Sequence, residues 1–319
     1  MMSTKGDESD ATVYVGRDVP DDSPVILIPL NQVGIERQAR MISVEDLDSS
    51  RSRQKDVYCE VSLCTDLHGD RRGIHASRFI EVLNEVSTGV HCSVGHYALA
   101  LADSLRATQA CSYGKAYVRA FYFRTVRSPV TKLSTYELIH LLAEAVARPD
   151  SQHLRIGLSM PIITACPCTQ EFSRAAAASG LLDEASRLPV DHSNEGRWLP
   201  PTHSQRGLLT VLLDDDKASI PVGDLLALAK SSVHGVYDLL KRPDEYELVK
   251  QAFSRPQFCE DVARQMAQAI WDHYGNQLAS SARLTVDVLS EESIHPHVLR
   301  AQIDMSLGEF AEYLRASAG

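Results

Sequence analysis

The sequence predicts an α+β protein built from two similar halves, each an antiparallel sheet with helices packed on one face. Segments with alternating apolar residues and segments with helical apolar spacing follow one another along the chain. Their order is strand, helix, helix, strand, strand in the first half, and the second half repeats it loosely. The 319 residues are 44% hydrophobic and 23% charged, which is sufficient for two units that each carry a core.

In the first half, alternation predicts strands at 57–63 and 115–126, and helical spacing predicts helices at 79–86 and 97–107. The segment 131–147 fits either a helix or a strand.

Before these elements, residues 1–23 are polar and acidic, which predicts a disordered or loosely docked arm. The apolar stretch 25–35, interrupted by Pro29, is expected to be extended, and the charged residues 36–54 are expected to form a loop.

In the second half, strands are predicted at 154–164, 207–213, 283–289 and 298–305. Helices are predicted at 170–187, 221–236 and 256–274, with Pro221 and Pro256 at helix starts. The Pro- and charge-bearing segment 188–201 is expected to be a loop. We therefore divide the chain into an arm (1–23), a first unit (24–150), a second unit (151–306) and a helical tail (307–319).

Composition limits the classes of partner. The net charge of -10 gives no general basic surface for nucleic acid or an anionic membrane. Any polyanionic substrate must therefore bind to a local basic cluster. Seven cysteines without framework spacing, no leader sequence and no apolar run of about 18 residues favour a cytoplasmic protein with unpaired thiols.

The segment Cys166-Pro167-Cys168 follows the predicted strand 154–164 and precedes a predicted helix. Reactive or metal-binding groups are common at such a junction. The C-x-C spacing is nevertheless too tight for ordinary zinc chelation by both thiols, and most free cysteines are buried hydrophobic residues. If this segment binds a metal, we expect one of the two thiolates to be a ligand and the other ligands to come from distant segments.

Four further segments place ionisable residues at the ends of predicted elements: 201–207, 240–245, 258–261 and 291–297. The segment 240–245 is expected to follow a helix. Each has a structural alternative, such as a solvated helix end for Lys241 and Arg242. A thiolate, imidazoles and a carboxylate brought together would suit Zn²⁺ or Fe²⁺, and the basic residues would suit phosphate.

Taken in register, these segments resemble the type IB GTP cyclohydrolases, which include bacterial folate-pathway enzymes and archaeal iron-dependent enzymes of methanopterin synthesis. The resemblance covers about residues 25–306. It is carried by Leu30-Asn31-Gln32-Val33-Gly34-Ile35, Gly73-Ile74-His75-Ala76-Ser77-Arg78-Phe79, Ala165-Cys166-Pro167-Cys168, Thr202-His203-Ser204-Gln205-Arg206, Leu239-Leu240-Lys241-Arg242-Pro243-Asp244-Glu245 and Glu292-Ser293-Ile294-His295.

The resemblance implies the tunnelling fold, with two tandem ββααββ units per chain, and a homotetramer with active sites at subunit interfaces. It also implies one divalent metal per subunit (Fe²⁺, Zn²⁺ or Mn²⁺) held by Cys166, His203, Glu245 and His295. Cys168, His203 and His295 become candidate acid/base groups, and Glu260 the guanine anchor. The implied triphosphate-binding residues are His75, Ser77, Arg78, Arg206, Lys241 and Arg242.

The implied reaction opens the guanine imidazole ring of GTP at C8, releases formate and rearranges the ribose to a 7,8-dihydroneopterin phosphate. The product is either the triphosphate or the 2',3'-cyclic phosphate. Ala76 stands where the family usually has Met, His-Asn-Gln-Arg is commoner than His203-Ser204-Gln205-Arg206, and the segment between Cys168 and His203 has the length of the archaeal branch. These departures leave open which product forms, and whether the substrate is GTP or a modified purine nucleotide.

Three other readings stay open at this point. A tunnelling-fold enzyme with a Cys nucleophile, like the nitrile reductases that act on a deazaguanine, would need no metal. A protein that only binds purine or pterin would release no formate. A thiol-redox role for Cys166 and Cys168 is disfavoured by their strained spacing.

Overall fold

The computed structural model describes residues 18–45, 54–109, 111–180, 200–238 and 240–317, and it confirms the α+β class. The strands are β1 (Leu30–Glu45), β2 (Gln54–Leu67), β3 (Val90–His91), β4 (Gly114–Arg127), β5 (Ser134–Arg148), β6 (Ser151–Ala165), β7 (Ser204–Asp214), β8 (His234–Gly235), β9 (Arg283–Glu291) and β10 (Val298–Ser306). The α-helices are α1 (Ala76–Ser87), α2 (Val94–Gln109), α3 (Pro167–Ala178), α4 (Val222–Ser232), α5 (Arg242–Ser254), α6 (Cys259–Tyr274) and α7 (Leu307–Ser317).

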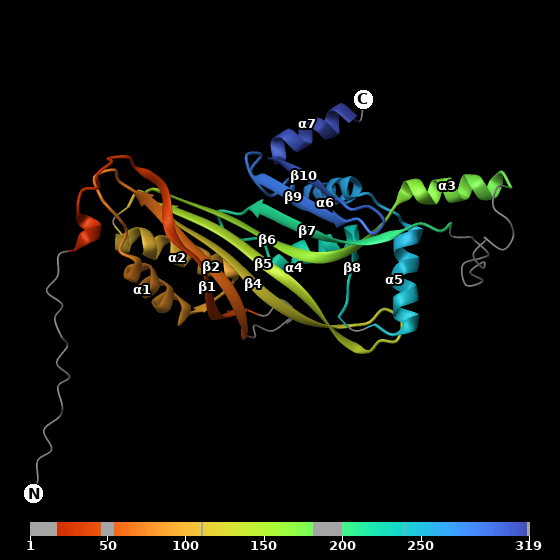
Figure 1. Ribbon diagram of the computed structural model, residues 1–319, viewed down its shortest axis with the longest axis horizontal. Coiled ribbons are helices and arrows are strands. Elements are labelled where there is room, and N and C mark those ends of the chain that lie inside the picture. Colours follow the sequence, from red (N-terminus) through yellow and green to blue (C-terminus); the bar gives the residue numbers. More distant parts are fainter. Residues whose placement is uncertain (1–17, 46–53, 110, 181–199, 239, 318–319) are drawn as a thin grey trace, which may run out of the picture.

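The strands of both halves join in one sheet, in the order β10-β9-β7-β6-β5-β4-β2-β1-β3, with β8 added beside β6 (Figure 1). Neighbouring strands are antiparallel except for the short parallel pair of β1 and β3. The first half follows the expected ββααββ plan, and the second half follows it with two additions: α3 between β6 and β7, and α5 between α4 and α6. The halves are joined where β5 pairs with β6.

One face of this sheet is apolar from end to end. Val118 of β4 lies opposite Ala143 of β5, which lies opposite Ile156 of β6, and Ile156 lies opposite Leu213 of β7. All four are buried. Because alternate residues of a strand share a face, these rows form a single apolar layer. Helices α1 and α2 cover it in the first half, and α4 and α6 cover it in the second.

The other face is mixed. One row of paired residues on this face runs across five neighbouring strands. It consists of Tyr58, Phe121, His140, Ser159 and Thr210. A sheet with one face packed and one face polar shows the alternation that made its strands recognisable in the sequence.

Two expectations from the sequence are wrong. Residues 36–45, expected in a loop, belong to the 16-residue strand β1. Most side chains of β1 are exposed and several are charged, so the strand lacks the apolar alternation on which the prediction depended. The segment 240–245 does follow a helix, α4, but Lys241 and Arg242 do not form the solvated end of that helix; they begin α5, which has Pro243 in its first turn. In addition, the ambiguous segment 131–147 contains strand β5, and α4 ends at Ser232 rather than near 236.

The described end of the predicted arm, residues 18–23, contains a 3-10 turn at Val19–Asp21. Backbone N–H groups of Arg72 and Gly73 donate to the Pro20 carbonyl and hold this turn against the fold. The remainder of the arm, and the residues 181–199 that cover most of the predicted loop and the end of the predicted helix 170–187, lie outside the described residues.

The C-terminal helix α7 packs through buried Leu307 and Phe310, and Phe310 lies beside Trp271 of α6. Within the described ranges no helix is both long and apolar enough to cross a membrane.

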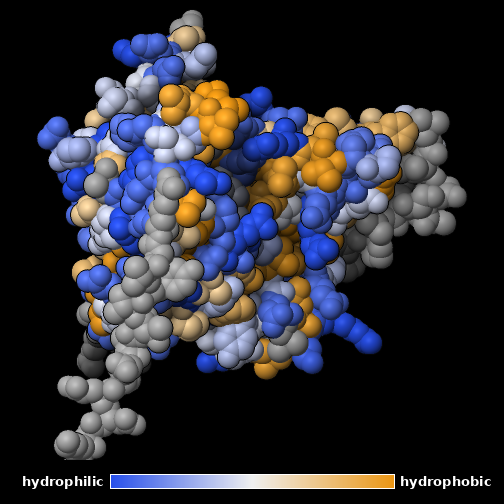
Figure 2. Space-filling view, turned by 60° about the vertical axis from the view of Figure 1, so that its left-hand side comes forward, coloured by the Kyte–Doolittle hydropathy of each residue, from blue (hydrophilic) through white to orange (hydrophobic). Residues whose placement is uncertain are grey.

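Apolar side chains also reach the surface, and Figure 2, which brings the α1 end of the molecule forward, shows them in separate patches among polar atoms. Four consecutive apolar residues, Val25 to Ile28, are each at least 66% exposed. They lie close to Gly69, whose added Cβ would meet the Leu27 carbonyl at 3.0 Å.

Helix α2 crosses the start of β4 at Gly114, and a side chain there would have no room. A Cβ on Gly114 would lie 2.0 Å from the Ala102 carbonyl oxygen of α2. We expect Gly114→Ala to lower the free energy of unfolding by about 1–3 kcal/mol or more, because backbone must shift to admit the methyl group. Denaturant unfolding measures this. Gly73→Ala is the matched control, since its Cβ would meet nothing nearer than 3.9 Å. Equal stability of the two variants would contradict the packing argument.

Candidate functional site

The Cys166 region lies at one end of the sheet, where β6 stops. Cys166 is the N-cap residue of α3, and Pro167 occupies the first turn. The backbone N–H of Cys166 donates to the His203 carbonyl over 3.1 Å, and the Thr202 hydroxyl donates to the Cys166 carbonyl over 2.6 Å. The pairing of β6 with β7 thus continues past the strand end and holds the Cys166 and His203 backbones side by side. The hydroxyl of Thr169 lies 3.6 Å from the Cys166 sulfur and donates to it.

His203 and His295 face the same space. Their ring centroids are 6.4 Å apart with the planes nearly perpendicular, and His297 stacks on His295 at 5.1 Å. His203 Nδ1 lies 3.0 Å from Oε1 of the buried Gln205, so the ring donates its Nδ1 proton there. The Nε2 atom of His203 then carries the lone pair. Metal-binding histidines are commonly oriented in this way by a partner on the second nitrogen.

The start of α6 is fastened to the same strand end. The backbone N–H of Gln257 donates to the Ala165 carbonyl over 3.2 Å and so holds the start of α6, whose first turn contains Glu260, at this strand end. The buried Cys259 thiol donates to Glu260 Oε2 over 3.2 Å. Burial, together with this hydrogen bond and the Glu260 charge, raises the pKa of Cys259 to about 12. The thiol therefore stays protonated and remains a donor to the carboxylate.

Helix α5 begins at the segment that contains Lys241, Arg242 and Glu245, and Asp244 fixes that start. Burial alone would raise the pKa of Asp244, but hydrogen bonds from Thr131, Lys241 and Val130 outweigh it and lower the pKa. The donors are the Thr131 hydroxyl and the backbone N–H groups of Val130, Thr131 and Lys241, at 2.6–3.0 Å. Asp244 thereby ties the turn between β4 and β5 to α5. The sequence contained this residue in its motif, but only the fold reveals the role.

Glu245 does not join the thiol and the two imidazoles within one chain. It lies in the first turn of α5, whereas Phe253, near the last turn, accepts a hydrogen bond from Gln170 of α3. Eight residues of helix separate these positions by about 12 Å. In the part of the chain that the structure describes, no three ligand atoms from Cys166, His203, Glu245 and His295 lie within 4.8 Å of one another. Cys168 is exposed in the first turn of α3.

His75, Ser77 and Arg78 lie at the start of α1, which is at the opposite end of the sheet from α3 (Figure 1). The His75 carbonyl accepts a hydrogen bond from Gln109 at the end of α2, beside the start of β4. That end of the sheet also holds the start of β6, and Cys166 follows the last residue of this 15-residue strand. The strand alone spans about 45–50 Å. A single chain cannot bring both groups to one small molecule.

At that end the buried His75 ring has partners that the sequence did not indicate. Asp18 Oδ2 lies 3.5 Å from its Nδ1, and Asp21 Oδ1 lies 3.2 Å from its Nε2. The guanidinium of Arg71 also pairs with Asp21. Hydrogen bonds from Arg71 and then His75 lower the pKa of Asp21. The N-terminal turn therefore places two carboxylates where the resemblance predicts phosphate oxygens.

We expect Asp244→Asn to lower the melting temperature at neutral pH by several degrees, because the amide keeps only part of the acceptor capacity of the carboxylate. The depressed pKa of Asp244 means that its contribution is present above the unfolded-state value of about 3.9 and is lost as the pH falls through the lower folded-state value.

The difference between wild type and Asp244→Asn should therefore shrink as the pH is lowered below about 4. Thermal unfolding followed across this pH range provides the measurement. Asp103→Asn, which removes an exposed carboxylate paired with Arg106, is the control. A difference that stays constant with pH would refute the assignment.

Comparison with known proteins adds two findings. A model of the family described as type I GTP cyclohydrolase FolE2 matches residues 17–301. Among curated relatives, the GTP cyclohydrolase MptA of Methanosphaera stadtmanae is 28% identical over 317 residues, covering 94% of this chain and 98% of the relative. The protein of the same name from Haloferax volcanii is 27% identical over 316 residues, with coverage of 94% and 98%.

Among solved structures, uricase from Arthrobacter globiformis aligns with a TM-score of 0.47 and 8% identity, covering 87% of this chain and 93% of the uricase chain. Urate oxidase from Bacillus sp. TB-90, as a hyperthermostable mutant, aligns with a TM-score of 0.45 and 9% identity, covering 88% and 99%.

Proposed function

Because the chain belongs to the type I GTP cyclohydrolase FolE2 family, we propose that it hydrolyses GTP at C8 of the guanine ring, releases formate and forms a 7,8-dihydroneopterin phosphate. Two waters enter the reaction, one at ring opening and one at formate release, and one water leaves when the pterin ring closes. This balance gives the triphosphate; the cyclic phosphate would form only if a hydroxyl of the pterin side chain also displaced diphosphate from the α-phosphorus. The observation that supports the proposal is that the backbones of Cys166 and His203 lie side by side at one sheet end, where the His203 and His295 rings are 6.4 Å apart.

These donors fit a divalent metal. A thiolate and two imidazoles suit Zn²⁺ or Fe²⁺, and the Nδ1 bond from His203 to Gln205 leaves Nε2 ready to bind. The metal, when bound, would supply Lewis-acid activation of water near neutral pH. We propose Glu245 as a further ligand, which must reach the metal from a second copy or after movement of α5. Mn²⁺ remains a third candidate metal.

The other roles follow from the chemistry of each side chain. Glu260, oriented by the Cys259 thiol, would accept hydrogen bonds from the guanine N–H edge. Cys168 and His295 are proposed to move protons at the ribose and the leaving nitrogen. Arg206, Lys241 and Arg242 are proposed to hold phosphate oxygens.

We propose that His75, Ser77 and Arg78 complete the triphosphate site of a neighbouring copy, because they lie a whole sheet length from Cys166 in their own chain. The exposed apolar residues 25–28 lie close to Gly69 at this end, and such a patch is typical of a protein interface. A homotetramer with shared sites is the assembly we expect.

We expect metal-loaded protein, incubated anaerobically with GTP, to release formate and a product that becomes fluorescent on oxidation. Cys166→Ala should lower the rate by more than about 100-fold, since even a residue that only orients a metal ligand is worth about 10–100-fold. Cys92→Ala removes an exposed thiol elsewhere and should retain activity. Phosphate analysis of the product distinguishes the triphosphate from the cyclic phosphate. GTP binding without formate under Fe²⁺, Mn²⁺ or Zn²⁺ would rule the proposal out.

Sharing of the site between chains can be tested by mixing two inactive variants. Arg78→Ala and Cys166→Ala remove groups from opposite ends of the sheet, so a mixed oligomer contains some sites in which both groups are intact. Coexpression with two different tags and purification through both should recover part of the wild-type formate release. Mixed oligomers no more active than either variant alone would show that each site is built from one chain.

A further inference from the structure

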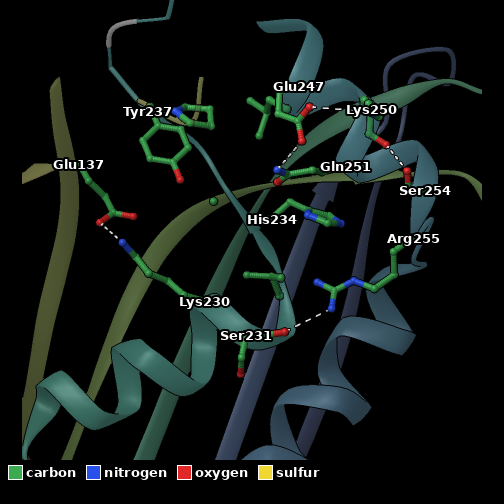
Figure 3. A pocket seen from close by; sticks show the side chains of 14 residues that line it. Glu137, Lys230, Ser231, His234, Tyr237, Glu247, Lys250, Gln251, Ser254 and Arg255 are labelled. Carbon is green, nitrogen blue, oxygen red and sulfur yellow. Dashed lines mark hydrogen bonds and ion pairs between the residues drawn. The ribbon is translucent and has the colours of Figure 1, made fainter. Parts of the chain in front are cut away.

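A cavity lies between the sheet and α5. None of the residues proposed above for metal, substrate or catalysis lines it. Its volume is about 490 Å³, within the range typical of small-molecule sites. The face of α5 that borders it carries Glu247, Lys250, Gln251 and Ser254 (Figure 3). Glu245 does not line the cavity, although it lies one helical turn from Leu248, which does.

Cations outnumber carboxylates around this cavity. Lys230, Lys250 and Arg255 line it together with Glu137 and Glu247. The buried Glu137 already accepts from Lys230 over 2.6 Å and lies 3.4 Å from the guanidinium of Arg124. Glu247 accepts from Gln251 over 2.9 Å and lies 3.9 Å from the ammonium of Lys250. Both carboxylates are thus neutralised locally, and the cavity as a whole favours an anion.

His234, from the short strand β8, supplies the polar atom that lacks a partner. Its Nε2 is buried and makes no hydrogen bond among the described residues. Burial and then the positive charge of Arg255 lower the pKa of His234, against a hydrogen bond to the Arg255 backbone. Figure 3 shows the His234 ring and the Arg255 guanidinium facing the same space. Buried polar atoms without hydrogen-bond partners are rare, so we expect a bound ligand to supply the partner of this nitrogen.

We propose that this cavity binds a phosphate-bearing small molecule, with Lys250 and Arg255 pairing with the phosphate and His234 Nε2 hydrogen-bonded to it. A phosphate monoanion presents both a P–OH donor and P–O acceptors, so it satisfies Nε2 in either ring tautomer. A carboxylate presents acceptors only. Arginine matches phosphate oxygens with a rigid fork of donors, while lysine adds a mobile point charge. The side chains that line the cavity differ from those of the proposed cyclohydrolase centre, and the cavity lies beside that centre, since His234 pairs with Ile163 of β6, three residues before Cys166.

The test uses isothermal titration of the full-length protein with inorganic phosphate. We expect saturable binding by the wild type, and at least a tenfold loss of affinity in the double variant Lys250→Gln/Arg255→Gln. His234→Phe should weaken binding similarly, because the phenyl ring keeps the shape but removes Nε2. Arg315→Gln, on the exposed side of α7, is the control and should bind as the wild type does. Thermal unfolding verifies that each variant folds, and the double variant changes only side chains at the rim of the cavity.

Three results would overturn the proposal. Absence of phosphate binding by the wild type is the first. Binding that survives in both cavity variants but disappears in Lys241→Gln/Arg242→Gln would place the phosphate in the proposed triphosphate site instead. Binding of acetate as tight as that of phosphate would show a general anion surface without recognition of phosphate.

Discussion

The pairing of β6 with β5 on one side and β7 on the other is the constraint on which the rest of the structure depends. It turns two ββααββ units into one sheet, and it aligns their apolar rows so that all four covering helices pack on the same face. It also fixes where β6 ends. Because β7 continues in register to Ser204, opposite Ala165, the backbones of Cys166 and His203 become neighbours. The placement of these two candidate residues is therefore a consequence of strand register.

Most of the fold could be predicted from the sequence because its strands are half-buried and its helices amphipathic. The strands beginning near 57, 115, 154, 207, 283 and 298 and the helices near 79, 97, 221 and 259 all leave a periodic apolar pattern. Strand β1 could not be found this way, since its outer residues, such as Glu36 and Arg37, are charged and face solvent. Helix α5 was missed because its charged motif occupies the helix start, where ionisable residues and Pro243 also suit a loop.

The positions of the candidate residues along the fold could be predicted from the sequence, but not which of them lie together. Cys166, His203 and His295 lie at the ends of elements, as the sequence pattern predicts. Nothing in the spacing of the sequence indicated that Glu245 lies about 12 Å along α5 from the end that contacts α3. Nor did it indicate that Asp18 and Asp21 approach His75. These placements depend on the lengths of strands and helices in space and on which of their ends meet. The local sequence pattern gives no information about either.

The continuous apolar layer has a consequence for how the protein unfolds. Separate domains with separate cores can melt one after the other, as independent units. Here the layer crosses the junction between the halves without interruption, from Ala143 of β5 to Ile156 of β6. Opening one half would expose the apolar edge of the other to water. Despite its duplicated plan, the chain is therefore built to lose its native structure in a single cooperative step.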